Sequence, residues 1–298
     1  MSITMRRDLQ TPIKQIYDNS KLQTFKDCPE KYRLKNILGL KKREEGQEEH
    51  DKNFGKAIHT GLELHYKGKS LDEIKEAFSK DYMVQLNEED KAKTQENGLT
   101  LLEAYIKHYK DEDKKWTIKA VEVADTFEIA PGLPFMVKID LVVEQQGCIY
   151  FVDHKTTGKA FNWTYWGQFE PNPQITAYTA YCQAKYGECS GGIINALQLG
   201  FRQRAYKGEP PGFHFEFQRQ LFNRNRQQVE EWKKDSSSWI IQIQNHKALG
   251  GDVWRKNEGQ CRFCSFKEIC ISCADEQIIE QLYEVTNPND YLEAKETV

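Results

Sequence analysis

The chain has 298 residues, of which 39% are hydrophobic and 29% are charged, so it can bury a sizeable core. No apolar run is long enough to span a bilayer, and residues 1–10 are polar and lack the apolar stretch of a secretory signal. We therefore expect a protein of a reducing compartment with no membrane partner. Its eight cysteines are then not expected to form a disulfide framework.

Charge is unevenly distributed along the chain, although the net charge is only −3. Residues 1–43 hold 11 Lys/Arg against 4 acids, and residues 44–113 hold 10 against 18. Residues 202–234 are basic again, with eight Lys/Arg against four glutamates. Such asymmetry permits a local positive channel, but on charge alone solvated helix faces explain it better.

The first part of the chain is predicted to be helical. A helix over residues 20–38 should restart at Pro29, because proline lacks a backbone N–H and suits a first turn. Residues 41–52 are charged and lack apolar periodicity, which indicates an exposed loop. Apolar residues at helical spacing then predict three helices, at 54–66, 71–85 and 92–109. We expect this acidic helical block to cover one side of the core as an insertion or lid.

From residue 116 the apolar residues alternate with polar ones, which is the period of β-strands. A helix should begin at Asn172, which can cap it ahead of Pro173, and end at Gly187. A long helix or helix pair is expected at 223–248, broken or kinked near 236–238. The predicted strands are 116–129, 135–143, 149–155, 192–202 and 213–217, the first three as a meander.

This order of elements predicts an α/β fold with a mixed central sheet flanked by helices. We divide the chain into a helical N-terminal part at 1–115, a core at 116–220 and a helical, cysteine-rich C-terminal region at 221–298. The three parts are expected to form one compact unit.

Asp140 and the sequence Asp153-His154-Lys155 lie in adjacent predicted strands. Residues two apart in a strand share a face, so Asp153 and Lys155 should project together, and hairpin pairing would bring Asp140 beside them. Carboxylates suit a hard divalent cation, and a lysine suits a phosphate or an attacking water. A solvated Asp–Lys pair explains this segment equally well when it is considered alone.

Two further groups on predicted helices carry suitable side chains. Gln174 and Tyr178 are four residues apart and share a helix face, where they could orient a water and hold a phosphate oxygen. His59 could complete the coordination of a divalent metal. The simpler interpretations are a half-buried helix face for the pair and a structural role for the histidine.

The most specific motif is formed by Cys261, Cys264 and Cys270. Cysteines separated by two residues on a tight turn converge on one metal ion or cluster. The fourth ligand would be Cys28 or Cys273. A structural zinc site is the main alternative, and ordinary buried thiols are less favoured.

In this order, the motifs resemble those of the RecB-like branch of the PD-(D/E)XK nuclease superfamily. The chain is most similar to its iron–sulfur members, such as AddB-type nuclease domains and the nucleases of CRISPR adaptation. The resemblance extends from residues 20–25 to Cys270. One departure from the pattern is Ile139, which precedes Asp140 at the position where the motif that names the superfamily has a proline.

The resemblance implies a restriction-endonuclease-like core and a Mg²⁺- or Mn²⁺-dependent deoxyribonuclease. An exonuclease acting on single-stranded DNA or DNA ends is favoured over an endonuclease. The implied metal ligands are His59, Asp140, Asp153 and the backbone carbonyl of His154. Lys155 would orient or activate the attacking water, and Gln174 and Tyr178 would lie against this lysine or the DNA backbone. The implied ligands of a 4Fe–4S cluster are Cys28, Cys261, Cys264 and Cys270.

The resemblance also implies DNA as the partner, with helicase, recombination or CRISPR proteins as candidate protein partners, in the cytoplasm or at the nucleoid. The basic stretch 202–234 would then follow the DNA backbone. A non-catalytic DNA-binding protein on a nuclease fold and a zinc-stabilised protein of other activity are the alternatives. The aromatic residues that could stack on unpaired bases, or equally pack into the core, are Trp163, Tyr165, Trp166 and Phe169.

Overall fold

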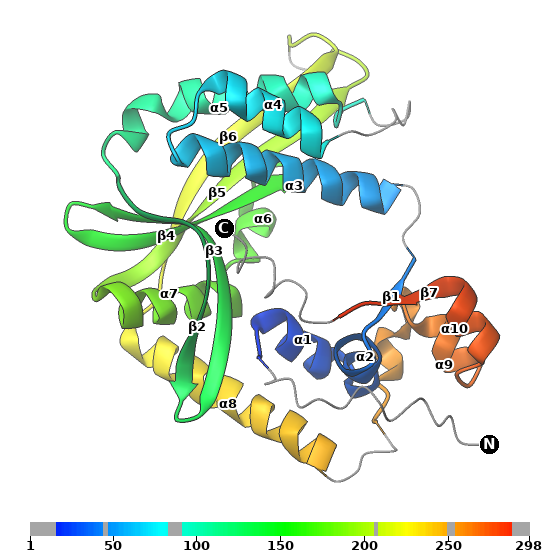
Figure 1. Ribbon diagram of the computed structural model, residues 1–298. Coiled ribbons are helices and arrows are strands. Elements are labelled where there is room, and N and C mark those ends of the chain that lie inside the picture. The colour runs from blue at the N-terminus through cyan, green and yellow to red at the C-terminus, as the bar shows by residue number, and fades with distance from the viewer. Residues whose placement is uncertain (1–15, 44–46, 83–90, 206–207, 249–253, 288–298) are drawn as a thin grey trace.

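The computed structural model describes residues 16–43, 47–82, 91–205, 208–248 and 254–287 (Figure 1). The helical elements are α1 (Asn19–Asp27), α2 (Pro29–Tyr32), the π-helical η2 (Arg33–Ile37), α3 (Gln47–Tyr66), α4 (Leu71–Asp81), α5 (Gln95–Asp113), α6 (Trp163–Gly167), α7 (Pro173–Tyr186), α8 (Arg226–Ala248), the 3-10 helix η3 (Glu258–Phe263), α9 (Lys267–Ile271) and α10 (Glu276–Leu282). The strands are β1 (Leu40–Lys42), β2 (Thr117–Ala130), β3 (Leu133–Gln145), β4 (Cys148–Thr157), β5 (Cys189–Arg202), β6 (Gly212–Asn223) and β7 (Tyr283–Val285).

A five-stranded mixed sheet in the order β2-β3-β4-β5-β6 forms the centre of the molecule. Strands β2, β3 and β4 are an antiparallel meander, as the alternating pattern predicts. Strand β5 is parallel to β4 and antiparallel to β6. A parallel step needs a crossover, and α6 and α7 supply it between β4 and β5. The predicted α/β fold with a mixed sheet is therefore confirmed.

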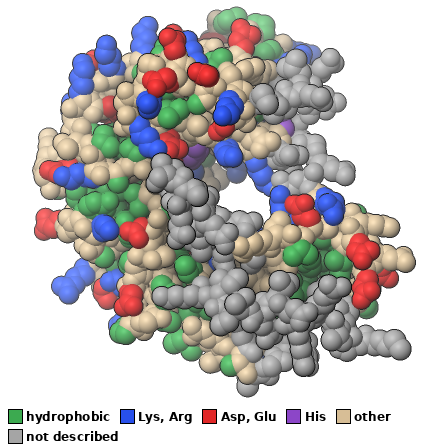
Figure 2. All heavy atoms as spheres, in the orientation of Figure 1, with side chains coloured by type: hydrophobic (Ala, Val, Ile, Leu, Met, Phe, Trp, Pro, Cys, Tyr) green, Lys and Arg blue, Asp and Glu red, His purple; other side chains and the backbone are tan. Residues whose placement is uncertain are grey.

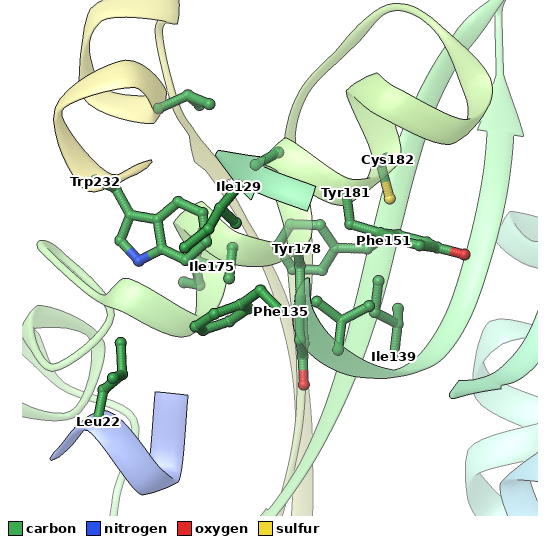
Figure 3. Close-up of a cluster of buried hydrophobic side chains, with 14 of the residues drawn as sticks. Leu22, Ile129, Phe135, Ile139, Phe151, Ile175, Tyr178, Tyr181, Cys182 and Trp232 are labelled. Carbon is green, nitrogen blue, oxygen red and sulfur yellow. The ribbon is translucent and has the colours of Figure 1, made fainter. Parts of the chain in front are cut away.

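Helices cover both faces of this sheet (Figure 1). Helices α7 and α8 pack on one face, over a core that includes Phe135, Phe151 and Trp232 (Figure 3). The helical block α3–α5 packs on the other face, where Leu197 and Leu199 of β5 join its apolar side chains. The expected acidic block over one side of the core is present.

Helix α7 shows how a local signal positions a functional helix. The side chain of Asn172 accepts hydrogen bonds from the backbone N–H groups of Gln174 (2.9 Å) and Ile175 (3.4 Å), and Pro173 occupies the first turn. The helix ends at Gly187, whose φ of 96° is accessible to glycine at little cost. Both ends are where the sequence predicts them.

Two elements differ from expectation. The segment predicted as a loop at 41–52 contains the end of β1 and the start of α3, because β1 pairs with β7 more than two hundred residues later. The predicted break at 236–238 is absent, and α8 is continuous there with Ser236 buried at 2% exposure. Residues 83–85 of the predicted helix 71–85 lie outside the described residues.

Strand β1, from the first part of the chain, lies side by side with β7, near the end of the described residues (Figure 1). Leu34 and Leu40 pack with Phe266, Ile269 and Tyr283 in a small core of their own. This arrangement brings Cys28 next to the cysteine-rich segment. Within the described ranges, no helix has the length and hydropathy needed to cross a membrane.

Candidate functional site

The site begins where β3 and β4 separate. Their pairing runs from Gln145 opposite Cys148 to Leu141 opposite Val152. Asp140 and Asp153 are the next residues on each strand, so both carboxylates lie at the point where the strands diverge. Oδ2 of Asp140 accepts a hydrogen bond from the backbone N–H of His154 at 2.7 Å. The hairpin therefore brings the two acids together as predicted.

Helix α3 adds His59, whose Nδ1 lies 3.5 Å from Oδ1 of Asp140. Phe54, Ile58 and Leu62 of this helix are buried and anchor it against the helical block, which turns His59 toward the strands. The sequence offers His59 as a candidate metal ligand, with a structural role as the simpler interpretation. The structure places it beside the predicted acid.

The carboxylates Asp140 and Asp153 have opposite pKa shifts. Burial raises the pKa of Asp140, but the hydrogen bond and charge of His59 outweigh burial and bring it down to about 2. Burial raises the pKa of Asp153, and the negative charge of Asp140 adds to that rise against the effect of Lys155. Two acids held close enough to repel one another are stabilised by a bound cation.

Lys155 and Asp153 project to the same side of β4, and Nζ lies 2.7 Å from Oδ2. Burial would lower the pKa of Lys155, but the charge of Asp153 outweighs it and the pKa is raised. The side chain is therefore an ammonium ion at neutral pH. It cannot accept a proton there, but it can orient a water or a phosphate oxygen by charge.

Gln174 and Tyr178 are joined to one another, since Nε2 of Gln174 donates to the Tyr178 hydroxyl at 2.8 Å. Burial raises the pKa of Tyr178, and the charge of Asp153 raises it further, so the hydroxyl lies near the acids and stays protonated. The predicted pair therefore belongs to the same neighbourhood as Asp153.

Glu122 on β2 was missed by the sequence analysis. Ligand atoms of His59, Glu122 and Asp140 all lie within 4.8 Å of one another. Val121 pairs with Leu141 and Val123 with Ile139, so Glu122 faces Asp140 across a gap in the ladder. Its φ of 53° is unusual for a residue other than glycine and marks a local irregularity next to the acids. An acid between two valines is the signal that could have identified it.

A buried polar cluster behind His154 was also missed. Nδ1 of His154 contacts Nδ2 of Asn195 at 2.6 Å, and Oδ1 of Asn195 accepts from Nε of Arg219 at 3.2 Å. The guanidinium also donates to Asp113 at 2.6 Å and to Tyr105 at 2.8 Å. His154, Asn195 and Arg219 are direct cross-strand neighbours on β4, β5 and β6.

Part of the basic stretch 202–234 is engaged within the protein and is not free to follow a DNA backbone. Arg219 is buried in the cluster, and Arg224 is buried with hydrogen bonds to Thr176 and to the carbonyl of Phe169. Arg202 pairs with Glu209 at 2.6 Å. In the sequence Arg219 and Arg224 look like unpaired charges, because their partners Asp113 and Thr176 lie far along the chain.

The aromatic residues after the motif lysine also separate into two groups. Tyr165 and Phe169 are each 5% exposed and belong to the core, and Trp166 packs against it. Trp163 is 85% exposed. Of the four, Trp163 is the side chain available for stacking.

The cysteine-rich segment docks onto Cys28. Sγ of Cys28 accepts a hydrogen bond from the backbone N–H of Asn257 at 3.4 Å, and the Asn257 side chain donates to the carbonyl of Asp27 at 2.8 Å. The pKa of Cys270 is raised, first by burial and further by the proximity of Cys264 and Cys28. Cys28 therefore lies beside the predicted motif, whereas Cys273 is exposed.

Comparison with known proteins agrees with these features. The family model of the PD-(D/E)XK nuclease superfamily matches residues 19–271. The crystal structure of a candidate exonuclease from Eubacterium rectale is 15% identical, with 87% of this chain and 91% of that chain covered and a TM-score of 0.50. That likeness shows a shared fold. The solved structure of SSO0001 is 11% identical over 72% of this chain and 83% of its own, with a TM-score of 0.29. No curated protein matches.

Proposed function

Because the chain belongs to the PD-(D/E)XK nuclease superfamily, we propose that it is a Mg²⁺- or Mn²⁺-dependent deoxyribonuclease, acting as an exonuclease on single-stranded DNA or DNA ends. The observation that carries this proposal is the convergence of His59, Glu122 and Asp140 beside the Asp153–Lys155 pair. The residues come from one helix and three adjacent strands. An ordinary surface ion pair would not need such an assembly.

The donor set fits a hard or borderline divalent cation. His59, Asp140 and Asp153 would hold it, with Glu122 and the backbone carbonyl of His154 as further ligands. The bound cation supplies Lewis-acid polarisation of the scissile phosphate and a water of lowered pKa. Asp140 is already ionised, since its pKa is lowered to about 2. Burial lowers the pKa of His59, but the hydrogen bond and charge of Asp140 outweigh burial and the pKa is raised, so a cation would compete with a proton for the ring.

Lys155 acts by charge in this proposal. As a half-buried ammonium 2.7 Å from Asp153, it is held in place to orient the attacking water and to stabilise charge that develops on the phosphate. Gln174 donates to the Tyr178 hydroxyl, which leaves the Tyr178 proton to donate to the DNA backbone. Each motif residue then has one distinct task.

We further propose that Cys28, Cys261, Cys264 and Cys270 hold a 4Fe–4S cluster. The docking of the Cys28 segment on Asn257 supports Cys28 as the fourth ligand. Such a link closes most of the chain into a loop and would stabilise the fold.

The test is digestion of end-labelled and circular DNA, single- and double-stranded, with Mg²⁺ or Mn²⁺. We expect linear single strands to be degraded and circles to survive. Lys155→Met should lower the rate by about 10²–10³-fold, the cost typical of removing one charge-stabilising donor. Lys185→Met, which removes an exposed partner of Asp125, is the matched control. Equal cleavage by wild type and Lys155→Met would refute the catalytic proposal.

If wild type and Lys155→Met both bind DNA and neither cleaves it, the result would instead favour a non-catalytic DNA-binding protein.

A further inference from the structure

Helix α3 carries His59, whereas the acids of the candidate metal site lie on the sheet, so the ligand set depends on how the helix sits on the strands. The buried apolar side chains of α3, among them Phe54, Ile58 and Leu62, pack within the helical block. Tyr66 is the last residue of α3 and lies seven residues after His59. Because seven residues make about two helical turns, His59 and Tyr66 share a face of the helix.

The ring of Tyr66 contacts the strand that follows the first acid. It lies flat against the imidazole of His154 on β4, with the ring centroids 5.7 Å apart and the planes at 8°. It also packs against the small core that contains Trp116 and Leu141. The backbone N–H of His154 donates to Asp140 at 2.7 Å. His154 is therefore a junction, with Tyr66 against its ring and Asp140 on its backbone.

The hydroxyl of Tyr66 is held separately from the ring. It donates to Oδ2 of Asp113 at 3.0 Å and accepts from Nη2 of Arg219 at 3.0 Å. The side chains of Asp113 and Arg219 are 14% and 7% exposed and are joined to one another at 2.6 Å. Hydrogen bonds to charged groups that are shielded from water are strong and directional. The hydroxyl thus ties the end of α3 to α5 and to β6.

We propose that Tyr66 is a positioning residue of the metal site and that it acts through His59. By fixing the end of α3 against His154, it sets the 3.5 Å approach between Nδ1 of His59 and Oδ1 of Asp140. The inference rests on the proposed metal-dependent function and adds a residue from outside the sequence motifs. Residues that orient metal ligands from behind typically contribute roughly 10–100-fold to metal affinity.

The His59 side chain is 33% exposed, and histidine is visible along the underside of the helical block in the view of Figure 2, so the site can be titrated with a cation. The variant Tyr66→Leu removes the stacked ring and the hydroxyl but keeps an apolar side chain against Trp116. We expect its Mn²⁺ affinity, measured by isothermal titration, to fall about tenfold. Tyr66→Phe keeps the stacked ring and should show a smaller loss.

A double-mutant cycle with His59→Ala separates positioning from a general structural role. In the His59→Ala background, Tyr66→Leu should cause no further loss of Mn²⁺ affinity, because the ligand that Tyr66 positions is gone. The same cycle with Tyr66→Phe decides the question if Tyr66→Leu does not fold. Unaltered Mn²⁺ affinity in the single variant, or an equal loss in the His59→Ala background, would overturn the proposal.

Tyr181→Leu is the matched control, since it also removes a tyrosine hydroxyl bonded to an aspartate, Asp125 at 2.8 Å, in the core on the other face of the sheet. It should lower the urea midpoint and leave Mn²⁺ affinity unchanged. An equal loss of affinity in Tyr181→Leu would reduce the effect to destabilisation and overturn the proposal. A wild type that binds no Mn²⁺ would refute the metal site and this inference together. A wild type that binds Mn²⁺ without cleaving DNA would refute the nuclease function alone.

Discussion

Asn195 joins His154 to Arg219 through the two ends of one side-chain amide. Its oxygen accepts from Nε of Arg219 at 3.2 Å, and its nitrogen lies 2.6 Å from Nδ1 of His154. A guanidinium can only donate, so the amide orientation is determined and Nδ1 of His154 must accept. Burial lowers the pKa of His154 to about 3, so the ring is neutral. The backbone N–H of His154 donates to Asp140. The contacts of the His154 ring with Asn195 therefore hold this strand segment in place from the opposite face of the sheet.

The first prediction concerns Arg219, whose side chain is 7% exposed. Arg219→Met should lower the free energy of unfolding by about 3–5 kcal/mol, because it leaves Asp113 buried without its cation and removes the donor to Asn195. Urea unfolding measures the change. Arg202→Met is the control, since its pair with Glu209 lies at the surface and should cost at most about 1 kcal/mol. Equal losses in the two variants would contradict the role assigned to the cluster.

The second prediction is a pH dependence of stability at Asp113. Burial alone would raise the pKa of Asp113, but hydrogen bonds from His65, Arg219 and Tyr66 outweigh it and lower the pKa below 3.8. A carboxyl with a lowered pKa stabilises the fold above its unfolded pKa, and that stability is lost as pH falls through the folded value. Asp113→Asn should therefore destabilise the protein most near neutral pH. The difference from wild type should shrink as pH falls below about 4. A difference that is constant with pH would contradict this account.

The sequence predicts the parts of the site that depend on local pattern. Alternation along two strands places Asp153 and Lys155 on one face and Asp140 beside them, and the strand pairing confirms it. The Asn172 cap and Gly187 predict the limits of α7. These features depend on neighbours within a few residues, so they can be read from the chain.

The remaining parts depend on contacts between distant residues. Arg219 appeared to the sequence analysis as one more charge in a basic stretch, but Asp113 and Tyr66 lie more than a hundred residues away. Glu122 lies opposite Asp140 because Val121 pairs with Leu141 and Val123 with Ile139 across the two strands. The pairing of β1 with β7 joins two segments more than two hundred residues apart. Neither the partners of Arg219 nor the pairing of β1 with β7 leaves a local signature in the sequence.

The third prediction tests Glu122 as a metal ligand. Glu122→Gln removes one negative charge from the trio with His59 and Asp140, so Mn²⁺ affinity should fall about tenfold or more. Isothermal titration measures the affinity. Glu128→Gln, an exposed position on the same strand, should leave it unchanged. An unaltered Mn²⁺ affinity in Glu122→Gln would remove this residue from the ligand set.

The fourth prediction separates the two candidates for the fourth cluster ligand. Cys28→Ser should lose iron and visible absorption and should unfold at lower urea, because the link between the two ends of the chain is broken. Cys273→Ser should retain both, since Cys273 is exposed beyond the motif. The reverse result would assign the fourth ligand to Cys273. A colourless wild-type protein with stoichiometric zinc would show that these cysteines hold zinc and not an iron–sulfur cluster.

The fifth prediction concerns Trp163, which is 85% exposed at the start of α6. If it stacks on an unpaired base, Trp163→Ala should weaken binding of single-stranded DNA by about 1–3 kcal/mol. Binding of blunt duplex should change much less, because paired bases do not offer a free face. Trp163→Phe keeps an aromatic face and should recover most of the affinity. Stability should stay within about 0.5 kcal/mol of wild type in both variants, as is usual for surface positions. A loss of affinity that is equal for single strands and duplex would instead indicate a contact with the phosphate backbone.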